Sequence, residues 1–163
     1  MLEHIIAIRQ VLEEEKNLLR EMLSACERQI EAFKNNDLAA LSAAVADLDR
    51  LSGAMAQLEE ERVRIHRALA AALHLTPGAT MREVVAALPD MWRGGLEKLH
   101  REMTALVRSL KSSNAVCRAL SERALQFNRL LQQAIEKVQG TTYEAGGRVK
   151  PVAAGFGRLD KSV

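Results

Sequence analysis

The residues that most often carry catalytic chemistry are few in this chain and poorly spaced for it. The chain has four histidines, at His4, His66, His74 and His100. None lies in an HExxH pattern, and His66 and His74 are eight residues apart, too far for two ligands of one metal ion on one helical turn. Cys26 and Cys117 form no CxxC pair. We therefore expect no metal site.

Motifs for phosphate binding and nucleophilic catalysis are also missing from the sequence. It contains no GxxxxGK[ST] and no GxGxxG, and Gly94-Gly95 and Gly146-Gly147 lack the strand-to-helix context that phosphate binding requires. The acidic run Glu13-Glu14-Glu15 is most simply a solvated helix face. No nucleophile, base and oxyanion site come together. We predict a protein that is not an enzyme, needs no cofactor and acts through its surface.

Composition indicates an all-α fold. A length of 163 residues suits one domain, and 48% apolar residues suffice for a core. Aromatic residues make up only 3%, however, which is unfavourable for sheets. Ala, Leu, Glu, Arg and Gln, all good helix formers, dominate instead.

Charge is distributed unevenly although the net charge is only +2, which does not suggest nucleic-acid binding. Residues 1–61 carry 13 acidic and 6 basic side chains, and residues 62–139 carry 6 acidic and 13 basic ones. Two interpretations remain: the two halves attract each other in the folded chain, or the basic half binds an acidic partner.

Helical periodicity runs through most of the chain. The first helix is expected at residues 2–34, ending at the turn-favouring Asn35-Asn36-Asp37. The second is expected at 38–75, ending at Thr76-Pro77-Gly78. Its heptad seam is apolar except at Arg62, which we interpret as a snorkelling side chain that sets the register.

A short connector and a long last helix follow. Thr80 and Glu83 match a capping box before a helix of about two turns. Trp92 either plugs one end of the bundle or is exposed to a partner, and Gly94-Gly95 separate it from the last helix, expected at 96–139. The apolar seam of that helix includes Cys117, and the first helix includes Cys26, so both thiols should be buried.

These elements predict an elongated antiparallel bundle of three long helices, coiled-coil-like, with a short connector helix, at residues 1–139. Residues 140–163 hold five of the nine glycines and no helical period, so we expect a flexible Gly-rich tail that orders at most on binding. The reduced cysteines and the lack of a signal peptide or long apolar run indicate a cytoplasmic protein without stable membrane insertion.

The chain resembles the FlgN-type flagellar export chaperones over roughly residues 1–150. The resemblance rests on the helix with LEEEKNLLREML, the second helix with LDRLSGAMAQLEEERVRI, and LLQQAIEKVQG followed by TTYEAGGR. Tyr143 and Gly147-Arg148 match a family pattern of a Tyr and then a Gly-Arg shortly after the last helix.

The resemblance implies an all-helical type III export chaperone that escorts hook-associated, or hook–filament junction, proteins and prevents their premature assembly. It also implies that the last helix and tail bind the C-terminal helical region of that cargo. Tyr143 would dock on the cytoplasmic domain of the export gate. The residues we assign to cargo binding are Leu120, Leu125, Phe127, Leu130, Leu131, Ile135 and Val138.

Two alternatives stay open at this point. Leu125, Leu130 and Ile135 either widen the apolar face for a partner or belong to a broader bundle core. The whole chain is either a chaperone or a structural scaffold that self-associates through its coiled-coil seams, and its oligomeric state is open.

Overall fold

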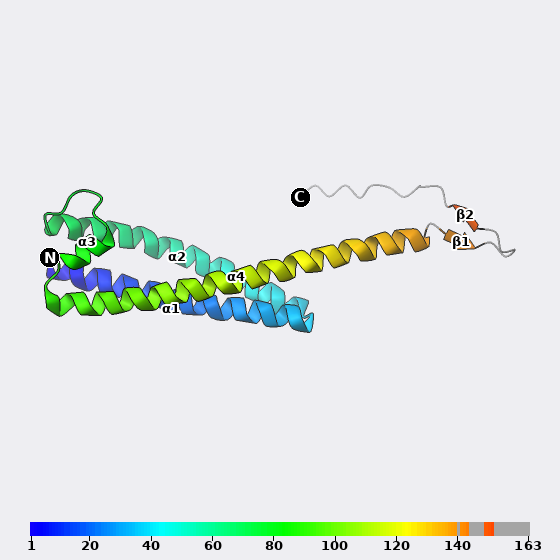
Figure 1. Cartoon of the computed structure of the whole chain (residues 1–163), viewed down its shortest axis with the longest axis horizontal. Coiled ribbons are helices and arrows are strands. Elements are labelled where there is room, and N and C mark those ends of the chain that lie inside the picture. The colour runs from blue at the N-terminus through cyan, green and yellow to red at the C-terminus, as the bar shows by residue number, and fades with distance from the viewer. Residues whose placement is uncertain (140, 144–148, 152–163) are drawn as a thin grey trace. The chain divides into compact units, whose positions relative to one another are not determined.

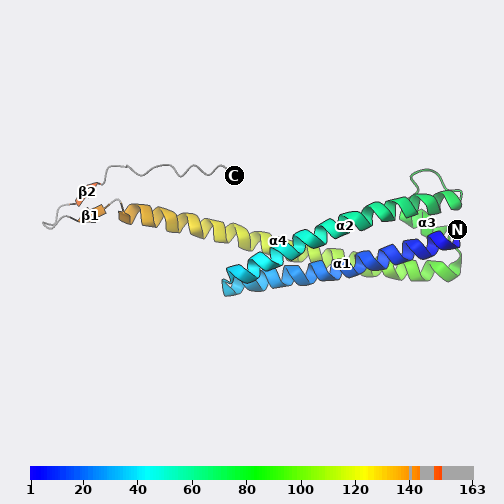
Figure 2. The same ribbon diagram turned by 180° about the vertical axis from the view of Figure 1, so that it is seen from behind.

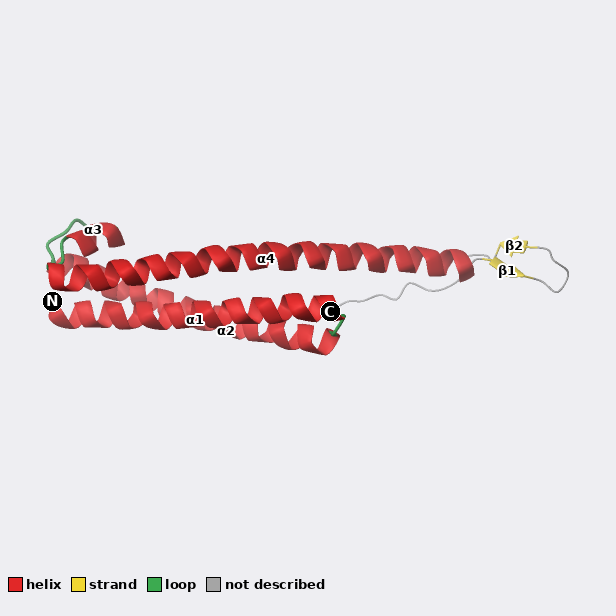
Figure 3. Cartoon of the chain, turned by 60° about the horizontal axis from the view of Figure 1, so that its bottom comes forward, coloured by secondary structure: helices red, strands yellow, loops and turns green. Residues whose placement is uncertain are grey.

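The computed structural model describes the backbone of residues 1–139, 141–143 and 149–151, and the side chains of residues 1–136. Its elements, in chain order, are α1 (Leu2–Asn35), α2 (Leu38–Ala72), α3 (Met81–Ala86), α4 (Asp90–Gln139), β1 (Thr141–Tyr143) and β2 (Val149–Pro151) (Figure 1). Helix dominates the described chain (Figure 3), so the helical class predicted from composition is confirmed. Within this part of the chain, no helix is long and apolar enough to cross a membrane.

The turn between α1 and α2 is closed by the residues that the sequence singled out. Asn36 adopts a left-handed conformation at φ 52°, which Asn tolerates better than most residues. Asp37 caps α2, because its Oδ1 accepts a hydrogen bond of 2.9 Å from the amide of Ala40. The chain therefore reverses direction within two residues.

α1 and α2 pack side by side and run antiparallel (Figure 2). An ion pair of 2.8 Å joins Arg28 to Asp47 near the turn, and one of 3.2 Å joins Glu15 to Arg62 farther along both helices. Residue numbers thus rise on one helix as they fall on the other.

α4 lies beside α1 and runs parallel to it. Lys16 binds Glu102 at 3.3 Å, and farther along both helices the Sγ of Cys117 lies 3.7 Å from the carbonyl oxygen of Cys26. Both cysteines are thiols that form no disulfide, and both are buried, as predicted, with exposed fractions of 0% for Cys26 and 5% for Cys117.

A hydrophobic cluster joins all four helices where α1 begins, α2 ends and α4 begins. Its buried residues are Ile5, Ile8, Leu69, Ala70, Ala79, Val84, Leu88 and Leu96. Trp92 is half-buried and packs against this cluster, which agrees with its interpretation as a bundle-end residue. α3 is held there by the predicted capping box, in which the Thr80 amide donates to Glu83 at 2.6 Å.

Two predicted helix boundaries are wrong. α2 ends at Ala72 and not at Leu75, because His74 takes a left-handed conformation at φ 56° and the Leu75 amide bonds back to Ala70. α4 begins at Asp90 and includes Trp92 and both glycines that we expected to precede it.

The chain divides into two compact units, Met1–Leu120 and Ser121–Val163. In the second unit, β1 and β2 form an antiparallel pair in which Thr142 lies opposite Lys150. We expected no regular structure in residues 140–163, so the two strands correct that expectation. The flexibility expected of residues 140–163 stays a prediction, as does the elongated three-helix bundle.

Candidate functional site

Burial along α4 changes sharply after Leu120. Cys117 is buried and Leu120 is half-buried, but every side chain from Glu122 to Glu136 is exposed. The predicted apolar seam is therefore confirmed up to Leu120. The heptad pattern of the sequence continues at Ala124, Phe127, Leu131 and Ala134, and these side chains are exposed.

α1 and α4 keep a parallel register within the Met1–Leu120 unit. Cys26 hydrogen-bonds Asn114 and lies against Cys117, and α1 has only nine more residues after Cys26. Parallel helices rise equally per residue, so Leu120 lies about level with residues 29–32 of α1, within the last two turns of that helix.

The exposed segment carries a contiguous apolar face. Phe127 and Leu131 are four residues apart, as are Leu131 and Ile135, and Leu130 lies three residues from Phe127. Side chains at these spacings lie on one side of a helix. Their exposed fractions are 61% for Phe127, 64% for Leu130, 44% for Leu131 and 53% for Ile135. We call these four residues the α4 apolar face.

Leu125 does not belong to this face, although it is 59% exposed. At ~100° per residue it lies about 140° around the helix from Leu120 and about 120° from Leu131. Its neighbours at three- and four-residue spacing are Ser121, Glu122, Asn128 and Arg129, all polar. Leu125 is therefore separate from the α4 apolar face, and its assignment to cargo binding stays a prediction.

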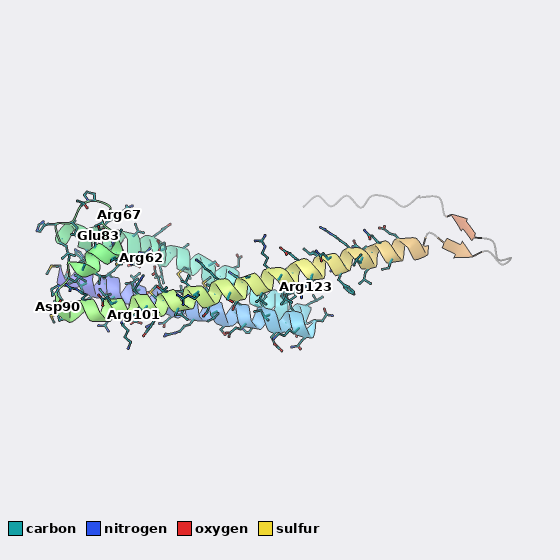
Figure 4. All side chains as sticks on the ribbon, in the orientation of Figure 1. Arg62, Arg67, Glu83, Asp90, Arg101 and Arg123 are labelled. Atoms are coloured by element: carbon teal, nitrogen blue, oxygen red, sulfur yellow. The ribbon has the colours of Figure 1, made fainter. Side chains whose placement is uncertain are left out.

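Polar side chains surround the α4 apolar face. Arg123 precedes Phe127 by one helical turn, carries a label in Figure 4, and has no ion-pair partner among the described side chains. Gln126, Arg129 and Gln133 lie toward the opposite side of the helix. An apolar stripe with a polar surround suits a helical partner that is itself amphipathic.

The remaining assigned residues lie farther along the chain. Val138 lies within α4, but its side chain is outside the described residues. Tyr143 is the last residue of β1 and lies opposite Val149 of β2 in the strand register. Its side chain is likewise outside the described residues.

Among the described side chains, no three His, Cys, Asp or Glu residues lie close enough together to hold a metal ion. Burial raises the pKa of the Cys26 thiol and of the Cys117 thiol. A raised thiol pKa leaves little thiolate at neutral pH, so neither is an activated nucleophile.

A family model described as FlgN protein matches residues 1–151. The chain belongs to the FlgN family. The match runs from α1 to the end of β2, so it includes both the α4 apolar face and Tyr143. FlgN proteins are flagellar chaperones that bind hook-associated proteins. Searches of curated proteins and of solved structures found no match.

Proposed function

We propose that this FlgN-family chain is a cytoplasmic flagellar type III export chaperone and not an enzyme. It binds the C-terminal helical region of a hook-associated protein, prevents premature assembly and delivers its cargo to the export gate. The observation that carries the proposal is the α4 apolar face: four large apolar side chains, each at least 44% exposed, on one side of a helix within the matched region.

The physical reason is the cost of leaving such a face in water. Burying apolar surface contributes roughly 25 cal/mol per Å², and a contiguous exposed patch marks an interaction site more often than single exposed residues do. A cargo helix that assembles only outside the cell has the same problem in the cytoplasm. Pairing the two apolar faces in a helix-to-helix contact removes both from water.

Calorimetry with a purified C-terminal helical fragment of a hook–filament junction protein tests this role. Leu131→Glu places a charge in the centre of the α4 apolar face and is expected to weaken binding by about a hundredfold or more, because central contacts dominate interfaces. The matched control is Leu125→Glu, the same substitution at a more exposed leucine of the same helix. Binding that both variants weaken equally would argue against the α4 apolar face.

Gate docking is assigned to Tyr143, which lies outside that face and in β1. A tyrosine suits a small interface because it offers a rigid ring with a polar end. Tyr143→Ala is expected to leave cargo affinity unchanged and to weaken binding to the cytoplasmic domain of the gate, with Tyr143→Phe intermediate. Loss of cargo binding with unchanged gate binding would reverse the two assignments.

The alternative function is a self-associating scaffold, for which the exposed α4 apolar face is also a candidate contact. Light scattering during size-exclusion chromatography separates the two functions. A large homo-oligomer that Leu131→Glu dissociates, without binding to cargo or gate, favours the scaffold.

A further inference from the structure

A groove on the Met1–Leu120 unit is separate from the α4 apolar face. It has a volume of about 890 Å³, and its lining residues come from α1, α2, α3 and α4, with none beyond Val107. This size falls within the range of pockets that bind ligands in proteins. No motif predicts this groove, because its lining residues are spread along the sequence from Leu12 to Val107.

The apolar part of the lining is rich in methionine. Met55 of α2, Met81 of α3 and Met103 of α4 all line the groove and are half-buried, and Val107 is 36% exposed. Methionine is unbranched and flexible, so surfaces rich in it adapt to apolar side chains of different shape.

The charges that α1 and α2 contribute to the groove are already paired. Arg62 of α2 forms an ion pair of 3.2 Å with Glu15 and donates two hydrogen bonds of 2.9 Å and 2.5 Å to the carboxylate of Glu59. This side of the groove therefore has one acid more than it has bases, but both of its carboxylates already bind Arg62.

α3 and α4 contribute surplus positive charge. They supply Arg82, Arg93 and Arg101 against the single acid Glu97. Arg93 is occupied by Asp90 at 3.1 Å and by the carbonyl oxygens of Ala86 and Leu88. Arg82 and Arg101 are exposed and have no ion-pair partner among the described side chains. Figure 4 labels Arg101 on α4.

We propose that this groove docks an amphipathic helix of a second partner protein, one whose apolar stripe is flanked by Asp or Glu. The apolar side chains enter the methionine-lined groove, and the flanking carboxylates pair with Arg82 and Arg101. Arg82 and Arg101 favour a partner helix with negative charge. A basic helix would meet like charge, and an uncharged helix would leave both arginines without an ion-pair partner. The inference does not depend on the cargo role of the α4 apolar face.

Two fluorescein-labelled peptides of roughly 18 residues, or five helical turns, serve as probes. Both repeat leucine at positions i, i+3, i+4 and i+7; one is flanked by glutamate and the other by lysine. Anisotropy is measured with the full chain carrying Leu131→Glu, so that the α4 apolar face contributes nothing. The acidic peptide is expected to bind at least about tenfold tighter than the basic one.

Three variants locate the binding. Arg101→Glu is expected to weaken the acidic peptide about tenfold and to improve the basic one, while Val107→Glu weakens both. Arg67→Glu is the matched control, because Arg67 is also exposed and unpaired among the described side chains but does not line the groove. Both arginines are exposed, so folding is retained, which circular dichroism checks.

Equal affinity for the two peptides, an unchanged affinity in Arg101→Glu, or no binding of either peptide overturns the proposal. A concentration-dependent dimer in sedimentation that Arg101→Glu dissociates overturns it too, because the occupant is then a second copy of this chain.

Discussion

Glu15 is a carboxylate with only 4% of its surface exposed, and Arg62 of the neighbouring helix holds it in place. Burial raises the pKa of Glu15, although the positive charge of Arg62 opposes that rise. This pair accounts for the polar residue that interrupts the otherwise apolar seam of α2. The sequence predicted a register-setting arginine here, and its partner on α1 became visible only in the folded chain.

Glu15→Gln is expected to raise the free energy of unfolding at pH 7. A carboxyl whose pKa is higher in the folded than in the unfolded state favours folding when protonated, so its contribution to stability falls as pH rises from about 4.5 through the raised pKa. Glutamine has no such loss. Urea denaturation at pH 7 and pH 4 should show a gain at pH 7 that shrinks at pH 4. A gain of equal size at both pH values would contradict the argument.

Arg62→Met is expected to act in the opposite direction. It leaves the buried carboxylate of Glu15 without its cation, which typically costs about 3 kcal/mol. Combining Arg62→Met with Glu15→Gln should recover a large part of that loss in a double-mutant cycle. If the two effects simply add, the pair is not coupled.

Leucine truncation separates the covered from the uncovered part of the predicted seams. Leu51→Ala is expected to destabilise by about 2–5 kcal/mol, because Leu51 is 1% exposed. Leu131→Ala is expected to cost under about 1 kcal/mol, because Leu131 is 44% exposed. Equal losses in urea denaturation would mean that Leu131 is buried after all.

Helix ends were predictable where the local chemistry decides them. Asp37 and Thr80 were recognised as caps because their side chains bond amides within the same turn. The end of α2 was placed three residues late, because no glycine marks it and His74 takes the left-handed position instead. The start of α4 was placed late, because burial of Leu96 and Leu99, each 3% exposed, outweighs the low helix propensity of the two glycines.

His74→Gly is expected to stabilise the chain by about 0.5–1 kcal/mol. A residue with a Cβ is strained at φ 56°, whereas glycine adopts that conformation readily, and the His74 side chain is exposed. Thermal unfolding followed by circular dichroism measures the effect, with His74→Ala as the control that keeps a Cβ. A lower melting temperature for His74→Gly than for wild type would refute the assigned conformation.

At the scale of the whole molecule, the features that were predictable are those that a short stretch of sequence determines. Periodicity located the long helices, and the quoted motifs indicated the family that the match over residues 1–151 shows. The three-residue strands β1 and β2 are too short for an alternating pattern to stand out. The groove depends on how α1, α2, α3 and α4 are spaced, and the exposed face depends on which part of α4 the other helices cover. Neither property belongs to a single segment.

Removal of residues 140–163 is expected to leave the unfolding of the helices unchanged. Every buried residue among the described side chains lies at or before Cys117. Thermal unfolding of the fragment ending at Gln139 should therefore overlay that of the full chain within about 2 °C. A markedly lower midpoint would show that the tail packs against the helices.

Hydrogen exchange on the full chain, with and without the C-terminal helical fragment of a hook–filament junction protein, tests the central claim most directly. If the fragment covers the α4 apolar face, amides of residues 122–136 should exchange more slowly when it is bound, and those of α1 and α2 should be unaffected. The result that contradicts the account is protection confined to α1, α2 and the groove, with no change at residues 122–136.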